Sequence, residues 1–328
     1  MNHPVFYLET GSQNPYYNLA FEEFVLTHRV EGDYLILWQN DNTIVIGQNQ
    51  NAEEEINRGF VEAHQIHVVR RSTGGGAVYH DLGNLNYSFI TDAGEDKLTF
   101  KRFTGPIVEA LKGLGLDAEA SGRNDILVNG RKVSGTAQRI FKNRVLHHGT
   151  LLFDSNPSLV AGALQVDPSK FQSKSSKSVR SRIGNIRDFL PKDMELLEFW
   201  EYLKGFLAGN GIVCADLKEE ELAEVNQLKI GKYDTWEWNF GRSPKYNVTN
   251  KQRYEAGILK FQVAVEGGHI QEIAFHGDFL ATSPMSPLTD ALIGCAFRRE
   301  DVATVLDRFD LTSLFGGITK DEILNVIF

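Results

Sequence analysis

The chain has little cysteine, no long apolar run and no excess of positive charge. Its 328 residues include only two cysteines, Cys214 and Cys295, without a Cys-x-x-Cys spacing. They give neither a disulfide framework nor a metal site, and they favour a reducing compartment, so we expect a cytoplasmic protein. No apolar run approaches the roughly 20 residues of a membrane helix, and the N-terminus lacks the features of a signal peptide. We therefore expect no membrane partner.

The net charge and the length indicate what kind of protein this is and how many domains it has. A net charge of −9 argues against a protein that binds nucleic acid by bulk electrostatics. A hydrophobic content of 42% and a charged content of 23% are ordinary for a globular protein. The length favours two domains. A Gly-Arg-Ser-Pro segment at 241–244 is typical of a boundary, so we expect a catalytic domain over 1–246 and an accessory domain over 247–328.

The most informative stretch is residues 70–84, Arg-Arg-Ser-Thr-Gly-Gly-Gly-Ala-Val-Tyr-His-Asp-Leu-Gly-Asn. Three glycines in a row forgo side-chain packing, which suits a loop that a ligand approaches closely. Their amides can form an anion-binding concavity, and Arg71 offers a fork of donors for a phosphate or carboxylate. The spacing is neither that of a Walker loop nor that of a Rossmann fingerprint. We favour a ligand loop over a glycine-rich hairpin with solvated arginines.

A second stretch, residues 121–153, contains Asn129-Gly130 between β-rich runs, which predicts a two-residue hairpin turn. The turn would pair Leu127 with Lys132 and Asp125 with Ser134. Alternation would then place Asp125, Lys132, Ser134 and Thr136 on one face. That face is either a ligand site or a solvated outer strand face. A return strand carrying His148 and Gly149 near the same surface would favour the site.

Residues 165–187 alternate serine with basic residues and lack helical or strand periodicity. Long unpatterned loops in compact proteins are usually functional or disordered. This one is either a phosphate-binding segment or a solvated linker.

The periodicity elsewhere predicts alternating helices and strands. We expect helices over 16–28, 52–65, 97–114, 191–208 and 219–228. We expect a hairpin of 34–39 with 43–47 and an antiparallel meander over 67–91. Near the C-terminus we expect a strand pair over 256–265 and 269–276, followed by helices around 288–295, 301–309 and 319–326.

Together these motifs resemble those of the lipoate–protein ligase A family. The blocks RRSTGGGAVYHDLGN, GRNDILVNGRKVSGTAQ, HHGTLL, SVRSRIGNI and TWEWNFGRSPKY follow the family order over nearly the whole chain. The resemblance implies an α+β fold: a mixed or antiparallel sheet in a catalytic domain of the biotin/lipoate ligase type, and a small C-terminal α+β accessory domain. It implies that ATP and lipoate, or octanoate, give an acyl-adenylate. The acyl group then passes to a lysine of a lipoyl domain of 2-oxoacid dehydrogenase E2 subunits or of glycine-cleavage H protein.

The resemblance also assigns site residues. Lys132 matches the catalytic lysine, and Asp125 is a candidate for holding Mg²⁺ through the phosphates. The remaining candidates for binding lipoate and ATP are Arg71, Gly74, Gly75, Gly76, Ala77, Val78, Tyr79, His80, Asn84, Ser134, Thr136, His148, Gly149, Arg180 and Arg182.

Two relatives of this chemistry remain as alternatives. An octanoyl- or lipoyl-amidotransferase would use a cysteine thioester, but Cys214 lies in a short apolar run without a neighbouring histidine, which predicts a core position. A biotin–protein ligase shares the architecture, but its basic glycine-arginine loop is absent. The ligase mechanism requires neither cysteine.

Overall fold

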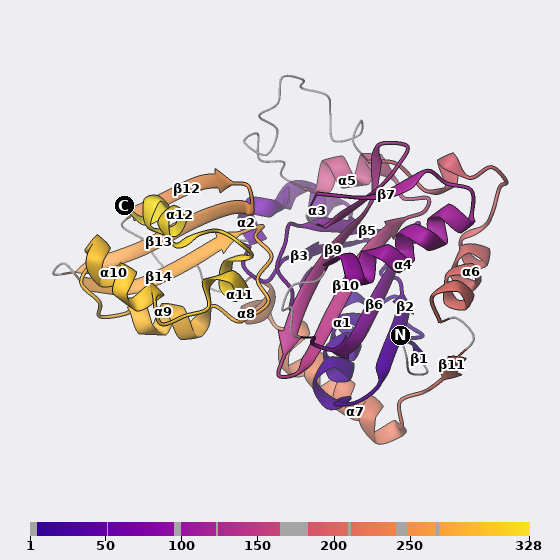
Figure 1. Ribbon diagram of the computed structural model, residues 1–328, viewed down its shortest axis with the longest axis horizontal. Helices are drawn as coiled ribbons and strands as arrows, with labels where there is room; N and C mark the ends of the chain where they lie inside the picture. The colour runs from indigo at the N-terminus through magenta and orange to yellow at the C-terminus, as the bar shows by residue number, and fades with distance from the viewer. Residues whose placement is uncertain are drawn as a thin grey trace.

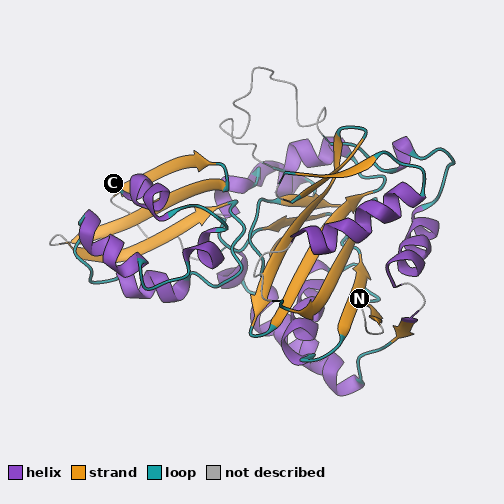
Figure 2. Cartoon of the chain, viewed as in Figure 1, coloured by secondary structure: helices purple, strands orange, loops and turns teal. Residues whose placement is uncertain are grey.

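The computed structural model describes residues 5–50, 52–94, 100–122, 124–164, 183–208, 211–240, 248–266 and 269–328. A large N-terminal part is built around an eight-stranded sheet, and a smaller C-terminal part is built around a three-stranded sheet (Figure 1). Figure 2 shows that both parts contain helices and strands, and in the C-terminal part the strands precede the helices along the chain, as in the α+β class. Among the described residues, no helix combines the length and the apolarity that crossing a bilayer demands.

The large sheet is mixed and has the strand order β11-β1-β2-β6-β10-β9-β8-β7. Strand β1 is parallel to both neighbours, and every other pairing is antiparallel. The strands are β1 (Val5–Glu9), β2 (Asp33–Trp38), β6 (Asn84–Asp92), β7 (Ala118–Ser121), β8 (Asp125–Val128), β9 (Arg131–Phe141), β10 (Arg144–Leu152) and β11 (Ile212–Cys214).

Both faces of this sheet are buried, as strand β2 illustrates. Leu35 and Leu37 belong to one apolar cluster, whereas Ile36 and Trp38 belong to another. Helices α4 (Phe100–Gly113) and α6 (Leu196–Ala208) supply the first cluster, and α1 (Pro15–His28) and α7 (Glu219–Leu228) the second. A single π-helical turn, Lys229–Tyr233, continues α7. The helices expected over 16–28 and 219–228 are therefore confirmed, and the helix expected from 191 begins at Leu196.

A second, three-stranded sheet of the N-terminal part overturns two expectations. Its order is β4-β3-β5, with β3 (Thr43–Ile46), β4 (His67–Arg70) and β5 (Val78–His80). Strands β2 and β3 thus lie in different sheets, so the hairpin expected over 34–47 is wrong. The meander expected over 67–91 is also wrong, because β3 separates β4 from β5 and β6 belongs to the large sheet. Residues 71–77 must therefore span the width of β3, which makes the glycine stretch an open loop instead of a tight turn.

The helix expected over 52–65 is broken into α2 (Ala52–Glu55) and α3 (Arg58–Ala63). Ile56 forms a β-bridge with Leu164 instead of continuing the helix. The Asn57 side chain accepts a hydrogen bond from the amide of Phe60 and so starts a new helix. The remaining helices of this part are short: α5 (Pro157–Ala163) and α8 (Trp236–Asn239).

The C-terminal part has its own apolar core. Strands β12 (Val248–Tyr254), β13 (Gly257–Glu266) and β14 (His269–Gly277) form an antiparallel sheet. Leu259, Phe261 and Val263 alternate along β13 and are fully buried. The helices that pack with them are α9 (Ser286–Leu292), α10 (Arg299–Leu306), α11 (Leu311–Phe315) and α12 (Lys320–Ile327). The expected strand pair is confirmed, and β12 was missed. The boundary at residue 246 stays a prediction.

Buried neutral histidines should make the fold sensitive to acid. His147 is fully buried and stacks on Phe103 with 4.9 Å between ring centroids. Burial lowers its pKa well below the ordinary value, and burial likewise lowers the pKa of His80 to about 3 and of His276 to about 4. Below about pH 6.5 the unfolded chain therefore binds more protons than the folded one.

We expect the free energy of unfolding to fall as the pH drops from 7 to 5, by at most about 1.4 kcal/mol per pH unit for each such histidine. His147→Leu should lower stability at pH 7 but flatten this slope, because one proton-binding difference is removed. Urea unfolding between pH 5 and 8 measures both quantities. An unchanged slope would show that His147 is not neutral in the folded state.

Candidate active site

A cavity of about 130 Å³ lies where the glycine loop meets strands β9 and β10. One wall is apolar, with Leu19, Trp38, Val45, Val78 and Ala137. The rest is polar or backbone and consists of Arg71, Gly75, Gly76, Ala77, His80, Asn86, Asn124, Lys132, Gly135, Thr136, His148, Gly149 and Thr150. Every lining residue precedes residue 151. The wall thus combines an apolar surface with polar groups, as small-molecule sites commonly do.

Arg71 shapes the glycine loop from beneath. Its guanidinium is buried and donates hydrogen bonds to the carbonyl oxygens of Val45, Gly74 and Gly76 and to the Thr73 hydroxyl. The expectation that Arg71 presents a free fork to a ligand is therefore wrong, because backbone carbonyls already occupy most of its donors. Its role is to hold the loop open.

Both arginines of the motif keep their charge without a carboxylate partner. Arg70 donates to five backbone carbonyl oxygens. Burial lowers the pKa of Arg70 and of Arg71 to about 10, which still leaves both protonated at neutral pH. Within the described part of the chain, neither guanidinium lies within ion-pair distance of a carboxylate. Arg71 lines the cavity, so its positive charge favours an anion there, although the Glu22 carboxylate offsets part of it.

The amides of the loop are partly occupied. Gly75 has a φ of +95°, which favours glycine, and its N–H donates to the carbonyl oxygen of Phe279 in the C-terminal part at 3.1 Å. No hydrogen bond among the described residues occupies the amides of Gly76 and Ala77. These two amides are the open part of the predicted anion-binding concavity.

The hairpin that carries Lys132 forms as predicted at its turn. Asn129 and Gly130 both have positive φ, +49° and +73°, which suits a two-residue turn. Leu127 pairs with Lys132, as expected. Beyond that point a β-bulge inserts Val133, so Asp125 pairs with Gly135 and not with Ser134.

The bulge decides which side chains reach the cavity. Lys132 and Gly135 share a face, and the Lys132 Nζ would lie 3.3 Å from a Cβ built on Gly135. The same ammonium pairs with Asp125 Oδ1 at 2.8 Å and is 40% exposed. Ser134 is fully buried and does not line the cavity, so its predicted place beside Lys132 is wrong. The Lys132 side chain thus lines the cavity, partly exposed and paired with Asp125.

The return strand β10 brings His148 and Gly149 to the same surface, opposite Ala137 and Thr136. This supports the ligand-site reading of the face over a solvated strand face. A Cβ on Gly149 would lie 2.6 Å from the Tyr87 hydroxyl oxygen, so only glycine fits there without displacing that ring.

His148 is held at both ring nitrogens. Nδ1 is 2.8 Å from Glu22 Oε1, and Nε2 is 2.8 Å from the Thr73 hydroxyl. Glu22 is 2% exposed and also accepts a hydrogen bond from the Ser88 hydroxyl at 2.5 Å. The ring therefore ties helix α1 to the glycine loop. Sequence reasoning missed Glu22, although a carboxylate within a helix as apolar as α1 is a signal that could have found it.

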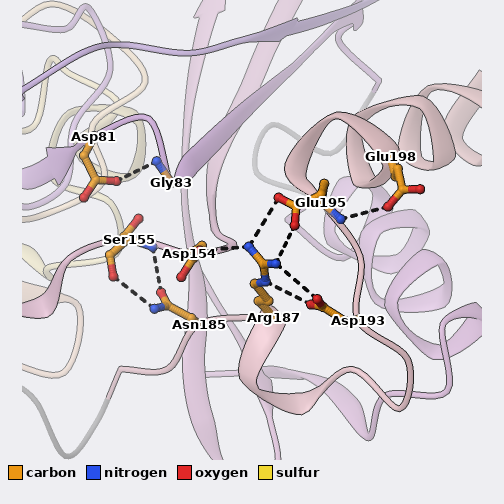
Figure 3. Close-up of polar contacts among 9 residues, drawn as sticks. All are labelled: Asp81, Gly83, Asp154, Ser155, Asn185, Arg187, Asp193, Glu195 and Glu198. Atoms are coloured by element: carbon orange, nitrogen blue, oxygen red, sulfur yellow. Dashed lines mark hydrogen bonds and ion pairs between the residues drawn. The ribbon is translucent and has the colours of Figure 1, made fainter.

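The end of the serine-basic stretch, residues 183–187, is held by hydrogen bonds and ion pairs, several of which Figure 3 shows. Gly184 N–H donates to the Lys132 carbonyl, and Asn185 exchanges two hydrogen bonds with the backbone of Ser155. Arg187 forms ion pairs with Asp154, Asp193 and Glu195. Arg187 is therefore an anchor and not a phosphate ligand. Arg180 and Arg182 lie outside the described residues.

The predicted site residues divide into two groups. Those that line the cavity are Arg71, Gly75, Gly76, Ala77, Val78, His80, Lys132, Thr136, His148 and Gly149. Of the others, Asp125 reaches the cavity through Lys132, and Gly74 packs against the C-terminal part. Tyr79 and Asn84 do not line it, because their side chains bond to Asn42 and Asn86.

Neither cysteine lies in the cavity. Cys214 is exposed on the edge strand β11, so its expected core position is wrong. Strands β1 and β2 separate it from the strands β6, β10 and β9 beside the cavity. Cys295 lies in the C-terminal part and is partly buried. The described residues contain no cluster of three or more histidine, cysteine, aspartate or glutamate side chains suited to a metal ion.

The fold and the site together define a lipoyl-ligase type of catalytic domain. Residues 14–208 match the Lipoyl protein ligase A/B catalytic domain, and residues 243–327 match the Bacterial lipoate protein ligase C-terminus. The lipoate-protein ligase LplJ of Bacillus subtilis is 44% identical over 321 residues, which cover 96% of this chain and 97% of that protein. The chain belongs to the lipoate–protein ligase family.

Two solved structures share the fold. One is a bi-partite lipoate protein ligase from Thermoplasma acidophilum, described with its E2 lipoyl domain; it is 32% identical, has a TM-score of 0.64, and covers 76% of this chain and 100% of its own. The other is a lipoate-protein ligase A bound with ATP, which is 29% identical, has a TM-score of 0.62, and covers 74% of this chain and 99% of its own.

Proposed function

We propose that the enzyme joins lipoate to ATP as lipoyl-AMP and transfers the lipoyl group to a lysine of a lipoyl domain. The observation that carries the proposal is the Lys132 ammonium at the mouth of a cavity with an apolar wall and open glycine-loop amides. The names of the relatives support lipoate as the substrate, and the ATP-bound ligase structure supports ATP.

In the first half-reaction, a carboxylate oxygen attacks the α-phosphorus and pyrophosphate leaves. Two negatively charged groups must then approach each other, which fixed cations and amides make easier. Arg71 supplies a permanent positive charge, and the amides of Gly76 and Ala77 supply donors. Lys132 can leave Asp125 and place its ammonium between the carboxylate and the phosphate.

In the second half-reaction, the acceptor lysine attacks the acyl carbonyl and AMP leaves. Negative charge then develops on the carbonyl oxygen and grows on the departing phosphate. The same ammonium of Lys132 stabilises both, so one residue serves both steps. No cysteine takes part.

Mg²⁺ would enter with the phosphates of ATP. Magnesium in nucleotide sites is usually bound by one or two carboxylates and the substrate phosphates. Asp125 is the carboxylate that fits this role, because it lies at the cavity mouth and becomes free when Lys132 turns to the substrates. The ion would offset phosphate charge.

The acceptor is a lipoyl domain, as the Thermoplasma system suggests. Lipoyl domains of 2-oxoacid dehydrogenase E2 subunits and glycine-cleavage H protein are the targets we propose, with lipoate as the acyl substrate and octanoate as a second candidate. A cytoplasmic location stays a prediction.

The direct test is exchange of labelled pyrophosphate into ATP by the purified protein with Mg²⁺. Lipoate should stimulate the exchange, and biotin should not. Mass spectrometry of the acyl-AMP formed from lipoate, octanoate and biotin offered together ranks the substrates. Absence of lipoate-dependent pyrophosphate exchange would contradict the proposed ligase function.

The cysteine-thioester alternative makes an opposite prediction. We expect the double variant Cys214→Ser, Cys295→Ser to keep lipoylation activity within about twofold, because surface changes away from the site have small effects. Gel-shift assays of a lipoyl domain, with lipoate and ATP, measure it. Loss of activity in a folded double variant would favour acyl transfer through a thioester.

A further inference from the structure

A chain of three buried polar side chains leads from helix α1 to the cavity. Asn18 lies in α1, Asn40 follows strand β2, and His80 ends strand β5. Asn18 and Asn40 are fully buried and His80 is 3% exposed. Asn18 Nδ2 is 2.9 Å from Asn40 Oδ1, and Asn40 Nδ2 is 3.1 Å from His80 Nδ1.

The direction of these hydrogen bonds is fixed at the start of the chain. Asn18 Nδ2 also faces the carbonyl oxygens of Ser12 at 3.0 Å and of Gln39 at 2.6 Å. Because carbonyls only accept, the group that faces them must be the Asn18 amide nitrogen. Its two hydrogens are shared among these carbonyls and the Asn40 side chain. Because Asn18 Nδ2 cannot accept, Asn40 presents Oδ1 to it, which leaves Asn40 Nδ2 to donate onward.

This polarity sets the tautomer of His80. Nδ1 accepts the hydrogen bond from Asn40, so in the neutral ring the proton sits on Nε2. Nε2 is buried and has no hydrogen-bond partner among the described residues, and His80 lines the cavity. A buried donor without a partner is costly, and because His80 lines the cavity, a ligand there can supply the acceptor.

We propose that Asn40, oriented by Asn18, is a positioning residue that fixes His80 as a neutral Nε2–H donor to an oxygen of the bound substrate. This inference rests on the proposed function. The acceptor is an oxyanion oxygen, either of the lipoate carboxylate or of the α-phosphate of ATP. Asn40 acts only through His80.

The charges around the ring support a neutral donor. Arg71 and His148 line the same cavity as His80 and act on it electrostatically, and His148 is hydrogen-bonded to Glu22. Burial, then Arg71, then His148 lower the pKa of His80 to about 3. The ring therefore stays neutral at working pH and donates without giving up a proton.

The first test is nitrogen-detected NMR of the wild-type protein, with His80 assigned by the variant His80→Gln. We expect a neutral Nε2–H ring from pH 6 to 8. An Nδ1–H ring or an imidazolium at pH 7 would overturn the inference. Lipoate and ATP are then added separately, and the one that shifts His80 Nε2 supplies the acceptor. If neither lipoate nor ATP shifts the His80 Nε2 resonance, the inference is also overturned.

The second test reverses the direction of the hydrogen bond between residue 40 and His80 Nδ1. Asn40→Asp keeps the shape but offers His80 Nδ1 a carboxylate that can only accept, so the neutral ring must carry its proton on Nδ1. At pH 8 adenylation should fall about tenfold or more, because Nε2 can no longer donate. At lower pH the carboxylate favours imidazolium, which restores the Nε2 proton, so the loss should shrink as pH falls.

Asn40→Ala is the matched variant, because it removes the partner without inverting it. We expect a smaller loss with the flat pH profile of the wild type between pH 6 and 8. If Asn40→Asp has the wild-type pH profile, the tautomer is not set by this chain. The wild-type NMR result decides the matter if the aspartate variant does not fold. Failure of the proposed function would appear separately, as absence of pyrophosphate exchange in the wild type.

Discussion

Lys132→Ala is expected to slow both half-reactions by about 10²–10³, the usual effect of removing one electrostatic donor from a transition state. The ammonium lies at the cavity mouth, and its only ion pair among the described residues is with Asp125 at 2.8 Å. The bulge at Val133 sets Lys132 on the face of Gly135, where its ammonium reaches the cavity.

Two assays separate the half-reactions: lipoate-dependent pyrophosphate exchange, and transfer from supplied lipoyl-AMP to a lipoyl domain. Lys112→Ala is a suitable control, because Lys112 is an exposed lysine on α4 whose partner is Glu109. Near-normal turnover of Lys132→Ala in both assays would show that Lys132 has no catalytic role and lies on a solvated strand face. A loss in adenylation alone would confine it to the first step.

Local signals predicted the parts of this site that local physics decides. Asn129-Gly130 specifies a turn by its own backbone preferences, so the hairpin and the pairing next to it were predictable. The bulge two residues later was not, because nothing in the alternation of β9 marks Val133 as extra. The slip moved Ser134 out of the cavity and left Lys132 in it.

Contacts between segments that lie far apart in the sequence could not be predicted from local patterns. Glu22 meets His148 across 126 positions, and Asn40 meets His80 across 40. Strand β3 inserts between β4 and β5, a pairing that no local pattern encodes. The free Arg71 fork and the buried Cys214 failed for the same reason, since each depends on which strand becomes a neighbour.

The C-terminal part touches the glycine loop directly, although it lines none of the cavity. Gly75 N–H donates to the Phe279 carbonyl, Gly277 N–H to the Asn49 carbonyl, and Ile140 N–H to the Thr282 carbonyl. These backbone contacts place residues 277–282 against the loop whose amides we assign to the anion. A movement of residues 277–282 would therefore change the conformation of the glycine loop.

The two half-reactions place opposite demands on that contact. Adenylation benefits from a site that excludes water, whereas transfer needs an open face that admits a protein acceptor. The cavity of about 130 Å³ is small beside the roughly 300 Å³ at which small-molecule sites begin. We therefore expect the C-terminal part to rotate relative to the catalytic domain between the steps.

Gly74→Ala tests this contact with one methyl group. A Cβ at Gly74 would lie 2.6 Å from the Ala281 nitrogen and 2.7 Å from the Phe279 oxygen, so the backbone of the C-terminal part must move away. We expect adenylation to fall by up to about 10², as misplacement of a positioned site can cause, and transfer from supplied lipoyl-AMP to fall less. Gly105→Ala is the matched control, because a Cβ there meets no atom within 4 Å.

Truncation near residue 247 should give the same division more strongly, because it removes all three backbone contacts together. The truncated protein must first show a cooperative unfolding transition, since the cut exposes the surface that residues 277–282 cover. Pyrophosphate exchange should then be impaired more than transfer from lipoyl-AMP. If both variants lose the two half-reactions equally, or lose neither, the C-terminal part does not control the glycine loop. If only the truncation separates them, the control acts through surfaces other than Gly74.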